Sequence, residues 1–390
     1  MNIAFRTDSS YTIGTGHIHR CLNIARKFKR KKSKCFFFVN DYPGNINKII
    51  QKEFALFNLS TNYSQNTYSY KSNIYDANLT IKLIKKLKID LLFIDNYLIQ
   101  EKWEEKVSKF CKIVFISDYL DRKSYCNFYI NYNVPYENIS ISKNLNQTCK
   151  KIIGTDYTII KKLPNLKKKT LKKKIVVFMG GVDTNNFTKK IISILSDRVF
   201  IGFEKVIIVG IRNKNKQSIL KQVKNLKNFN ILNGDKKNLY DTFSNSTLII
   251  TGASTSMYEH LALGLNSIVV AQNKLQNKIL NKLSELNLIN FIKYKNKISK
   301  NYINSVLKKE KRTQDVKILK NLFDSKGVNR IVEYFLNKNI LKDAKLRKVV
   351  NEDKYFLFRL VNDPEVIKNS LLKKTINFKE HNLWFNKALK

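Results

Sequence analysis

Short apolar runs alternate with longer stretches of helical apolar spacing from residue 1 to about residue 335. Apolar runs that are each followed by a polar loop and a helix are typical of buried parallel strands. In the first half we expect strands at 3–5, 35–39, 91–95, 113–117 and 128–130. In the second half we expect them at 175–179, 204–210, 230–232, 248–251, 267–271 and 289–292. The alternation predicts α/β layers with right-handed crossovers.

A basic segment at 161–174 breaks this alternation, and it holds one of only four prolines in the chain. We interpret it as a linker between an N-terminal α/β domain at 1–160 and a second at 175–340. The predicted fold is therefore α/β, with two Rossmann-like domains that face each other across a cleft. Ligand sites are expected at the carboxyl ends of the strands. Within the second domain we expect helices at 273–288, 302–323 and 329–337.

The composition indicates a globular protein, and its 390 residues are enough for two domains and a remainder. No apolar stretch is long enough for a transmembrane helix, and the N-terminus lacks the pattern of a signal peptide. The five cysteines form no CxxC pair, which fits a reducing cytoplasm better than a disulfide framework. We therefore expect a cytoplasmic protein without membrane insertion.

A net charge of +43 has two interpretations. It can indicate affinity for nucleic acid or for an anionic surface. It can also reflect composition alone, because lysine and asparagine are abundant throughout the chain. The basic runs at 27–34 and 161–174 do not interleave aromatics with arginines as stacking modules do. The compositional interpretation, with no nucleic-acid partner, is therefore favoured.

The segment at 14–21 reads Gly-Thr-Gly-His-Ile-His-Arg-Cys and lies between the first predicted strand and a helical pattern. Gly14 and Gly16 would let the backbone approach a ligand closely, and a helix N-terminus favours anionic groups. His17 can carry a proton near neutral pH, which makes it the candidate general base. The alternative is a histidine that only packs, and this is the expectation for His19.

Two loops of the second domain resemble phosphate cradles. One follows a strand and contains Gly180 and Gly181, and it is neither a GxGxxG motif nor a P-loop. The other offers the hydroxyls of Ser254, Thr255 and Ser256 at a helix N-terminus, where they suit a pyrophosphate. Each loop has a structural alternative, a tight turn for the first and a plain helix cap for the second.

Polar residues also end two strands of the first domain. Asp95 and Tyr97 close one strand, and Asp118 and Asp121 follow the next. Tyr97 can equally be a packed aromatic residue, and loop capping is the default role for the two aspartates after the second strand. No cluster of His, Cys, Asp and Glu has metal-ligand spacing, so we expect no metal. No Gly-x-Ser-x-Gly elbow is present, which argues against a serine hydrolase.

In this order, the motifs resemble those of the UDP-2,4-diacetamido-2,4,6-trideoxy-β-L-altropyranose hydrolases of pseudaminic acid biosynthesis. The resemblance covers roughly residues 1–335, and the first motif is the most specific. The later motifs are shared with UDP-sugar glycosyltransferases of the two-domain B type. The matching stretches are 5–10, 13–21, 94–97, 117–122, 153–157, 178–183, 253–265, 271–276 and 324–327.

The resemblance implies a B-type glycosyltransferase fold used for hydrolysis without a cofactor. UDP would lie against the two loops of the second domain, with Glu259 on the ribose. His17 would activate water to attack the anomeric carbon, and Tyr97 and Asn273 would orient the sugar or the water. The residues implied to contact the substrate are Gly14, Gly16, Asp95, Gly180, Gly181, Asp183, Ser254, Thr255, Ser256, Glu259 and Asn273.

The tail at 341–390 differs in character from the rest of the chain. Its Asn-Asp-Pro-Glu-Val at 362–366, with the later His381 and Trp384, resembles the opening of a Gcn5-related N-acetyltransferase domain. The acetyl-CoA loop of such a domain is absent, and so short a segment cannot bury a core of that type. We expect an incomplete, inactive segment, and a fused or associated N-acetyltransferase is the partner that it implies.

The sequence is therefore consistent with three functions. The leading one is a metal-independent hydrolase that cleaves a UDP-sugar to UDP and free sugar. The first alternative is an inverting glycosyltransferase that uses the same UDP site with a sugar acceptor. The second alternative, from another class, is a basic nucleic-acid-binding protein.

Overall fold

The computed structural model describes residues 1–59, 70–118, 122–133, 143–161, 163–164, 172–183, 185–210, 212–234, 239–285, 289–309, 313–336, 347–371 and 374–389. The chain divides into two compact units, each with its own sheet. The first unit comprises Met1–Lys161 and Lys326–Lys390, and the second comprises Lys162–Ser325.

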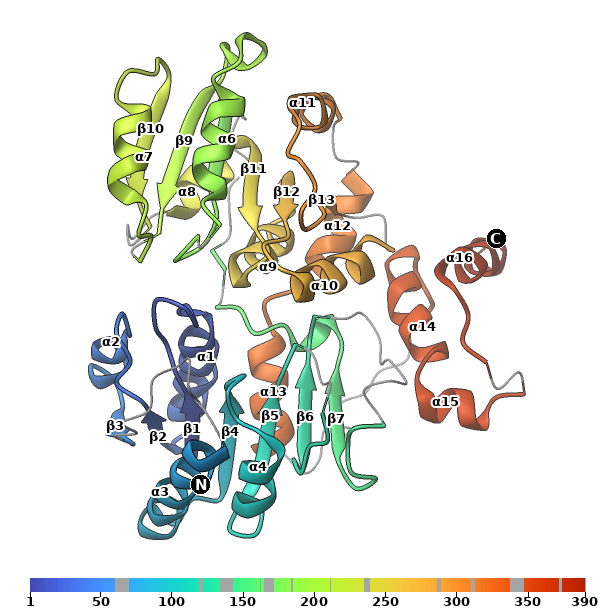
Figure 1. The fold of residues 1–390 in the computed structure, drawn as a ribbon. Coiled ribbons are helices and arrows are strands. Elements are labelled where there is room, and N and C mark those ends of the chain that lie inside the picture. The colour runs from blue at the N-terminus through green and yellow to red at the C-terminus, as the bar shows by residue number, and fades with distance from the viewer. Residues whose placement is uncertain are drawn as a thin grey trace. The chain divides into compact units, whose positions relative to one another are not determined.

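The first unit is built on a parallel sheet with the strand order β3-β2-β1-β4-β5-β6-β7 (Figure 1). Its strands are β1 (Asn2–Thr7), β2 (Lys34–Val39), β3 (Ala55–Asn58), β4 (Leu91–Asp95), β5 (Lys112–Ile116), β6 (Phe128–Asn131) and β7 (Lys150–Ile153). Its first helices are α1 (Gly16–Arg30), α2 (Asn47–Gln51), α3 (Tyr70–Leu87), α4 (Glu101–Val107) and the 3-10 turn η2 (Thr155–Tyr157).

The centre of this sheet is held by aromatic residues on adjacent strands. The Phe5 ring stacks on Phe37 at a centroid distance of 5.0 Å and on Phe93 at 5.1 Å. These three residues are in register across β2, β1 and β4 and are fully buried. Full burial on both faces explains why the central strands appear in the sequence as continuous apolar runs.

All five strands expected in this half are present, and two strands were missed. The missed strands β3 and β7 are the edges of the sheet. Ala55 and Asn58 of β3 are exposed, as are Lys150 and Lys151 of β7. An edge strand that is only partly covered lacks the continuous apolar run on which the prediction depended.

The second unit carries a parallel sheet with the order β10-β9-β8-β11-β12-β13 (Figure 1). All six strands expected in this half are present: β8 (Lys172–Phe178), β9 (Glu204–Val209), β10 (Phe229–Asn233), β11 (Ser246–Gly252), β12 (Ser267–Val270) and β13 (Asn290–Ile292). The helices are α6 (Phe187–Leu195), η3 (Arg198–Phe200), α7 (Lys216–Val223), α8 (Leu239–Ser244), α9 (Thr255–Ala262), α10 (Lys274–Ser284), α11 (Lys300–Lys308) and α12 (Thr313–Leu322).

Two details of the predicted helices differ from the structure. The single helix expected at 302–323 is two helices, because α11 ends at Lys308 and the next residue, Lys309, has extended backbone angles. The end of the helix expected at 273–288 includes 286–288, which lie outside the described residues. In the linker expected at 161–174, residues 162 and 165–171 also lie outside them, and Lys172–Lys174 belong to β8.

Helix α13 (Gly327–Leu336) belongs to the first unit, which corrects the boundary expected at residue 340. Phe335 packs on Phe93 and Phe128, with ring centroids 5.5 and 4.9 Å apart. A side chain at Gly327 would lie 2.3 Å from the carbonyl oxygen of Thr158, so only glycine permits this close approach. The sequence pattern predicted a helix at 329–337 but did not reveal which sheet it packs against.

The C-terminal segment is helical in the part that the structure describes, and it clusters with the first unit. It forms η4 (Asn351–Asp353), α14 (Lys354–Val361), α15 (Pro364–Asn369) and α16 (Phe378–Ala388). The Tyr355 and Phe378 rings stack at 5.0 Å, and Arg359 donates to Asp156 at 2.6 Å. His381 is buried against the Lys354 carbonyl, which gives it a packing role. The resemblance to an N-acetyltransferase stays a prediction.

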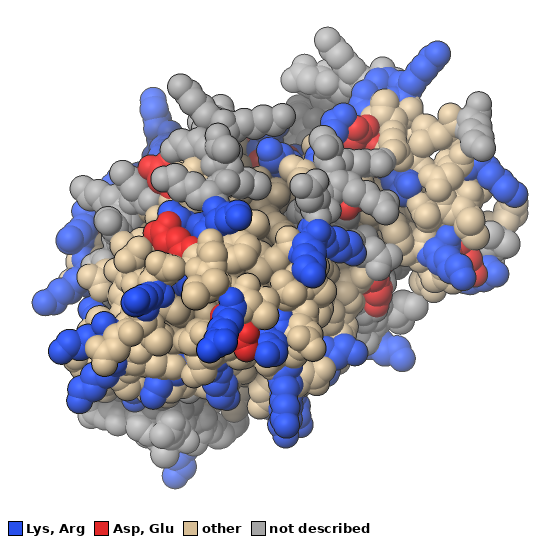
Figure 2. Space-filling view, turned by 90° about the horizontal axis from the view of Figure 1, so that it is seen from above, with Lys and Arg blue, Asp and Glu red and all other residues tan. Residues whose placement is uncertain are grey.

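Lysine and arginine side chains are spread over the face drawn in Figure 2, with few acidic side chains among them. They do not gather into a single patch on that face. Within the described residues, no helix is long and apolar enough to cross a membrane.

His260 on α9 is a buried histidine without hydrogen bonds. Its side chain is fully buried, and neither ring nitrogen has a hydrogen-bond partner among the described residues. Its ring packs edge-on against Phe243 at a centroid distance of 4.5 Å. Burial lowers the pKa of His260 to about 3, because the imidazolium would lose its hydration.

This burial predicts a pH-dependent loss of stability. Below about pH 6.5 the unfolded chain binds a proton at His260 and the folded chain does not, so stability falls as the pH falls towards 3. For this one group the loss is about 1.4 kcal/mol per pH unit. His260→Leu removes it, so the variant should gain about 2 kcal/mol on the wild type between pH 6.5 and pH 5. Urea unfolding followed by circular dichroism at several pH values measures this difference, and a constant difference would contradict it.

Candidate functional site

The segment that follows β1 places His17 in the first turn of a helix. Gly14 has a φ of +81°, a conformation that favours glycine, and it forms a small bridge with Ser10. Helix α1 begins at Gly16, earlier than the sequence pattern suggested, so His17 lies in the helix and not in a loop. Arg20 lies one turn further and faces the same side.

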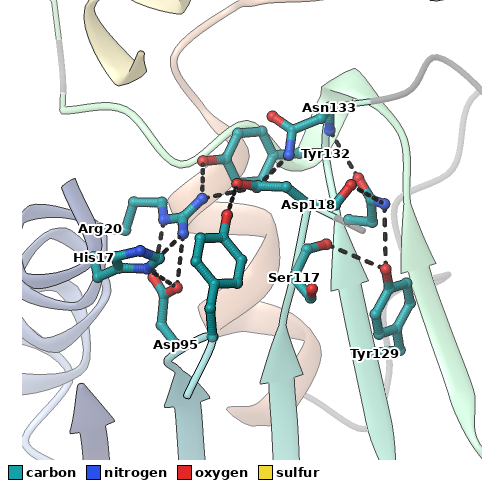
Figure 3. Close-up of polar contacts among 10 residues, drawn as sticks. His17, Arg20, Asp95, Ser117, Asp118, Tyr129, Tyr132 and Asn133 are labelled. Atoms are coloured by element: carbon teal, nitrogen blue, oxygen red, sulfur yellow. Dashed lines mark hydrogen bonds and ion pairs between the residues drawn. The ribbon is translucent and has the colours of Figure 1, made fainter. Parts of the chain in front are cut away.

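Asp95 meets both of these side chains at the carboxyl end of β4, the strand beside β1 (Figure 3). Its Oδ1 lies 2.5 Å from Nδ1 of His17. Arg20 donates to Asp95 twice, from Nε at 2.8 Å and from Nη2 at 2.7 Å. Asp95 is fully buried and His17 is 6% exposed. A bidentate guanidinium–carboxylate pair of this kind fixes geometry as well as charge.

The contact with Asp95 favours one tautomer of the His17 ring. An ionised carboxylate only accepts hydrogen bonds, so the tautomer that satisfies Asp95 carries its proton on Nδ1 of His17. Nη2 of Arg20 lies 2.9 Å from the same nitrogen, and in this tautomer it donates to Oδ1 of Asp95 at 2.7 Å instead. The lone pair of the neutral ring is then on Nε2, which has no hydrogen bond to any described residue. A histidine oriented by a carboxylate and with a free nitrogen can accept a proton from a bound nucleophile.

Asp118, just after β5, extends the network to the next strands (Figure 3). Its Oδ1 accepts from Arg20 at 2.8 Å and from the amide of Asn133, and its Oδ2 accepts from the Tyr97 hydroxyl. Tyr132 accepts a further hydrogen bond from Arg20 at 3.1 Å. Burial alone would raise the pKa of Asp118, but Arg20 and these hydrogen bonds outweigh it and lower the pKa below its ordinary value.

The same surroundings raise the pKa values of Arg20 and Tyr97. Burial opposes the charge on Arg20, but Asp118 and Asp95 outweigh it and raise the pKa of the guanidinium well above its ordinary value. Desolvation of the hydroxyl, followed by the nearby Asp118, raises the pKa of Tyr97 well above its ordinary value. Both groups therefore keep their protons at neutral pH, Arg20 as a cation and Tyr97 as a neutral donor.

A second buried network fixes the loop that carries Tyr97. Arg6 pairs with Asp76 at 2.7 Å and with Asp8 at 2.8 Å, and all three are buried. Asp8 also accepts from the side-chain amide of Asn96 at 2.7 Å. Because Asn96 directly precedes Tyr97, this network holds the backbone from which Tyr97 projects.

In the second unit, the loop after β8 lies against two glycines of neighbouring strand ends. A side chain at Gly210 would lie 2.3 Å from the Gly180 carbonyl oxygen and 2.4 Å from that of Gly181. A side chain at Gly252 would lie 2.9 Å from the Met179 carbonyl. Gly180 itself has a φ of +91°, which favours glycine. These glycines allow the loop its conformation and its position.

The loop after β11 leads into helix α9 at Thr255. Ser254 holds the N-cap position with extended backbone, but its side chain does not cap the helix. Its hydroxyl has no hydrogen-bond partner among the described residues and lies 3.7 Å from the position of a Cβ at Gly180. The two predicted phosphate loops are therefore neighbours. Ser256 follows Thr255 in the first turn of α9.

Three of the other predicted ligands already have partners in the fold. Asp183 accepts from the backbone N–H groups of Phe187 and Thr188, so it caps α6. Asn273 accepts from the N–H of Gln276 and caps α10. Glu259 lies beside the Tyr240 hydroxyl, and burial together with this carboxylate raises the pKa of Tyr240. Contact of these residues with a substrate stays a prediction.

The structure brings His17, Asp95 and Tyr97 together in the first unit, and the glycine and serine loops together in the second. Sequence reasoning missed Arg20, although its position one helical turn after His17 was a usable signal. It took Asp118 for a loop cap, and the structure shows a partly buried ion pair with Arg20 instead. His19 is exposed by its surface area, and desolvation of its ring, followed by the nearby Arg26, lowers its pKa; the packing role expected for it stays a prediction. Asp121 lies outside the described residues. Among the described residues, no cluster of metal ligands occurs.

Comparison with known proteins gives two relatives, and no family model matches the chain. The chain is 26% identical over 416 residues to an uncharacterized protein of Methanocaldococcus jannaschii, which covers 99% of this chain and 78% of that protein. It is 27% identical over 271 residues to the UDP-2,4-diacetamido-2,4,6-trideoxy-beta-L-altropyranose hydrolase of Campylobacter jejuni, which covers 68% of this chain and 90% of that protein.

Solved structures give the fold. The glycotransferase of kitacinnamycin matches 86% of this chain and 98% of its own, with a TM-score of 0.62 and 10% identity. MurG of Acinetobacter baumannii matches 86% of this chain and 99% of its own, with a TM-score of 0.59 and 10% identity. The UDP-GlcNAc 2-epimerase of Neisseria meningitidis, bound to UDP-GlcNAc, matches 87% of this chain and 100% of its own, with a TM-score of 0.52 and 12% identity. The fold is that of the B-type glycosyltransferases.

The packing of the glycine loop predicts the effect of a single methyl group. Gly210→Ala should displace the loop at Gly180, because the new Cβ would collide with two carbonyl oxygens. We expect the affinity for UDP, the ligand that the family resemblance implies for this loop, to fall by roughly tenfold, a change of about 1.4 kcal/mol. Calorimetric titration with UDP measures it. Gly202→Ala is the matched control, since a Cβ there meets nothing within 4 Å. Equal affinities in the two variants would contradict the prediction.

Proposed function

We propose that this protein is an enzyme that acts on a UDP-sugar, with His17 as the general base. The observation that carries the proposal is the His17–Asp95 pair, in which Asp95 binds Nδ1 at 2.5 Å and no described residue makes a hydrogen bond to Nε2. A histidine in this arrangement is suited to take a proton from a hydroxyl or from water.

The reaction would replace the bond between the sugar and the diphosphate. The nucleophile would give its proton to Nε2 of His17 while its oxygen attacks the anomeric carbon. The bond between that carbon and the phosphate oxygen would break, and its electron pair would stay on UDP. With water as the nucleophile, the products are free sugar and UDP.

The second unit would bind the UDP part. The loop at Gly180 and Gly181 and the N-terminus of α9 offer backbone N–H groups, which bind phosphate in many proteins. The Ser254 hydroxyl, which no described residue hydrogen-bonds, lies where these two loops adjoin. Glu259 would accept the ribose hydroxyls.

Two nucleophiles are consistent with this chemistry. Water is favoured by the Campylobacter jejuni relative, which is named as a hydrolase of a UDP-diacetamido-trideoxyhexose. A hydroxyl of an acceptor is favoured by the similar solved structures, which include glycosyltransferases. The similarity to solved structures covers more of the chain than the match to this relative, so transfer to an acceptor has the stronger support. Hydrolysis of this diacetamido sugar nucleotide is the more specific proposal.

A substitution of His17 tests the proposal. His17→Gln should lower kcat for UDP release by roughly a thousandfold, because the general base is lost, and should leave UDP affinity nearly unchanged. The assay measures UDP release from UDP-2,4-diacetamido-2,4,6-trideoxy-β-L-altropyranose, and from UDP-N-acetylglucosamine for comparison. Mass detection of the sugar product with and without added acceptor sugars separates hydrolysis from transfer.

His19→Gln is the matched control, since His19 is an exposed histidine on the same helix turn. It should retain wild-type turnover. If His17→Gln retains it as well, His17 is not the base. If the wild type releases no UDP from any sugar nucleotide, the proposed function is wrong.

A further inference from the structure

Asp118 in the first unit accepts more hydrogen bonds from distant residues than a residue that only caps a loop. Its carboxylate accepts hydrogen bonds from the Tyr97 hydroxyl, from Nη1 of Arg20 at 2.8 Å and from the amide of Asn133 (Figure 3). These donors come from the ends of β4 and β6 and from helix α1. Three donors from three elements meet on one side chain.

Tyr97 depends on this carboxylate for its position. The residue is 50% exposed, so packing alone does not hold its ring. Its ring lies edge-on to the His17 ring, at a centroid distance of 4.7 Å and an angle of 85°. The hydrogen bond to Asp118 is the polar contact that anchors the end of the side chain. An exposed tyrosine without that bond would gain rotamer freedom, since ordering a free side chain costs entropy.

Arg20 joins Asp118 to the pair that orients His17. One guanidinium group binds Asp118 through Nη1 and Asp95 through Nε and Nη2. Its position is therefore set by both carboxylates together. Asp95 already satisfies Arg20 in bidentate fashion, so a second buried carboxylate is not required as a counter-ion.

We propose that Asp118 is a positioning residue, which holds the Tyr97 ring against His17 and, through Arg20, steadies Asp95. The imidazole is then fixed in two ways, since Asp95 holds Nδ1 and Tyr97 covers the ring. The catalytic meaning of this arrangement rests on the proposed function. The arrangement itself can be tested without any substrate.

The first experiment uses the NMR signals of the histidine rings, of which the chain has only four. Because the Tyr97 ring lies 4.7 Å from the His17 ring, it should shift the signals of the His17 ring protons, and Tyr97→Ala identifies that shift. Tyr97→Phe keeps the ring and deletes only the hydroxyl bond, and Asp118→Ala deletes the same bond from the other side. We expect both variants to lose most of the shift, because the ring is released. Asp156→Asn is the control, since Asp156 pairs with Arg359 and not with this network.

Two outcomes would overturn the proposal. One is a His17 signal that responds to Tyr97→Ala but not to Tyr97→Phe or Asp118→Ala. The other is a His17 signal that ignores Tyr97→Ala, because the ring would then not lie on His17 in solution. Tyr97→Phe changes an exposed residue, so the test remains decisive even if Asp118→Ala fails to fold.

The second experiment measures UDP release. We expect Tyr97→Phe and Asp118→Ala each to lower kcat by roughly tenfold or more with little change in KM, since displaced catalytic groups reduce the rate. The double variant should be no slower than Asp118→Ala alone, and Asp118→Asn, which keeps an acceptor oxygen, should be partly active. Multiplicative losses would indicate that Asp118 does not act through Tyr97 and would overturn the proposal. A wild type that releases no UDP contradicts the proposed function, and the NMR result still decides the positioning.

Discussion

Two buried arginines at the carboxyl edge of the first sheet determine how this unit is arranged. Arg6 is enclosed by Asp8 and Asp76, and Arg20 by Asp95 and Asp118. A buried charge is costly unless a partner of opposite charge meets it in good geometry. The strand ends and helices that supply the carboxylates are therefore tied to one another, and the side chains between them have little freedom.

The two networks differ in what they hold. The network around Arg6 fixes backbone, since Asp8 binds the side chain of Asn96 and the backbone N–H of Asn40. The network around Arg20 fixes the groups with chemistry, namely His17, Asp95 and Tyr97. In the second unit the corresponding constraint is steric. Glycines at neighbouring strand ends let the loop at Gly180 and Gly181 lie close to the sheet.

Much of the fold could be predicted from the sequence because parallel strands buried on both faces appear as continuous apolar runs. The edge strands β3 and β7 lack such runs, and the predictions missed them. The location of α13 also escaped prediction, because an apolar helix face does not state which sheet it covers. At the site, His17 and the glycine loops carry local signals. Asp118 and Arg20 are 98 positions apart in the sequence, so their ion pair could not be predicted from residue spacing.

The central claim is that Asp95 keeps His17 in the tautomer and orientation that a general base needs. Asp95→Asn tests it most directly, because the amide keeps the shape of the side chain but can donate to Nδ1 and favour the wrong tautomer. The decisive measurement is kcat for UDP release at neutral pH, beside the UDP affinity and the circular dichroism of the same sample. The account predicts a folded variant with near wild-type UDP affinity and a kcat lower by roughly a thousandfold. A folded variant that turns over at the wild-type rate would contradict it.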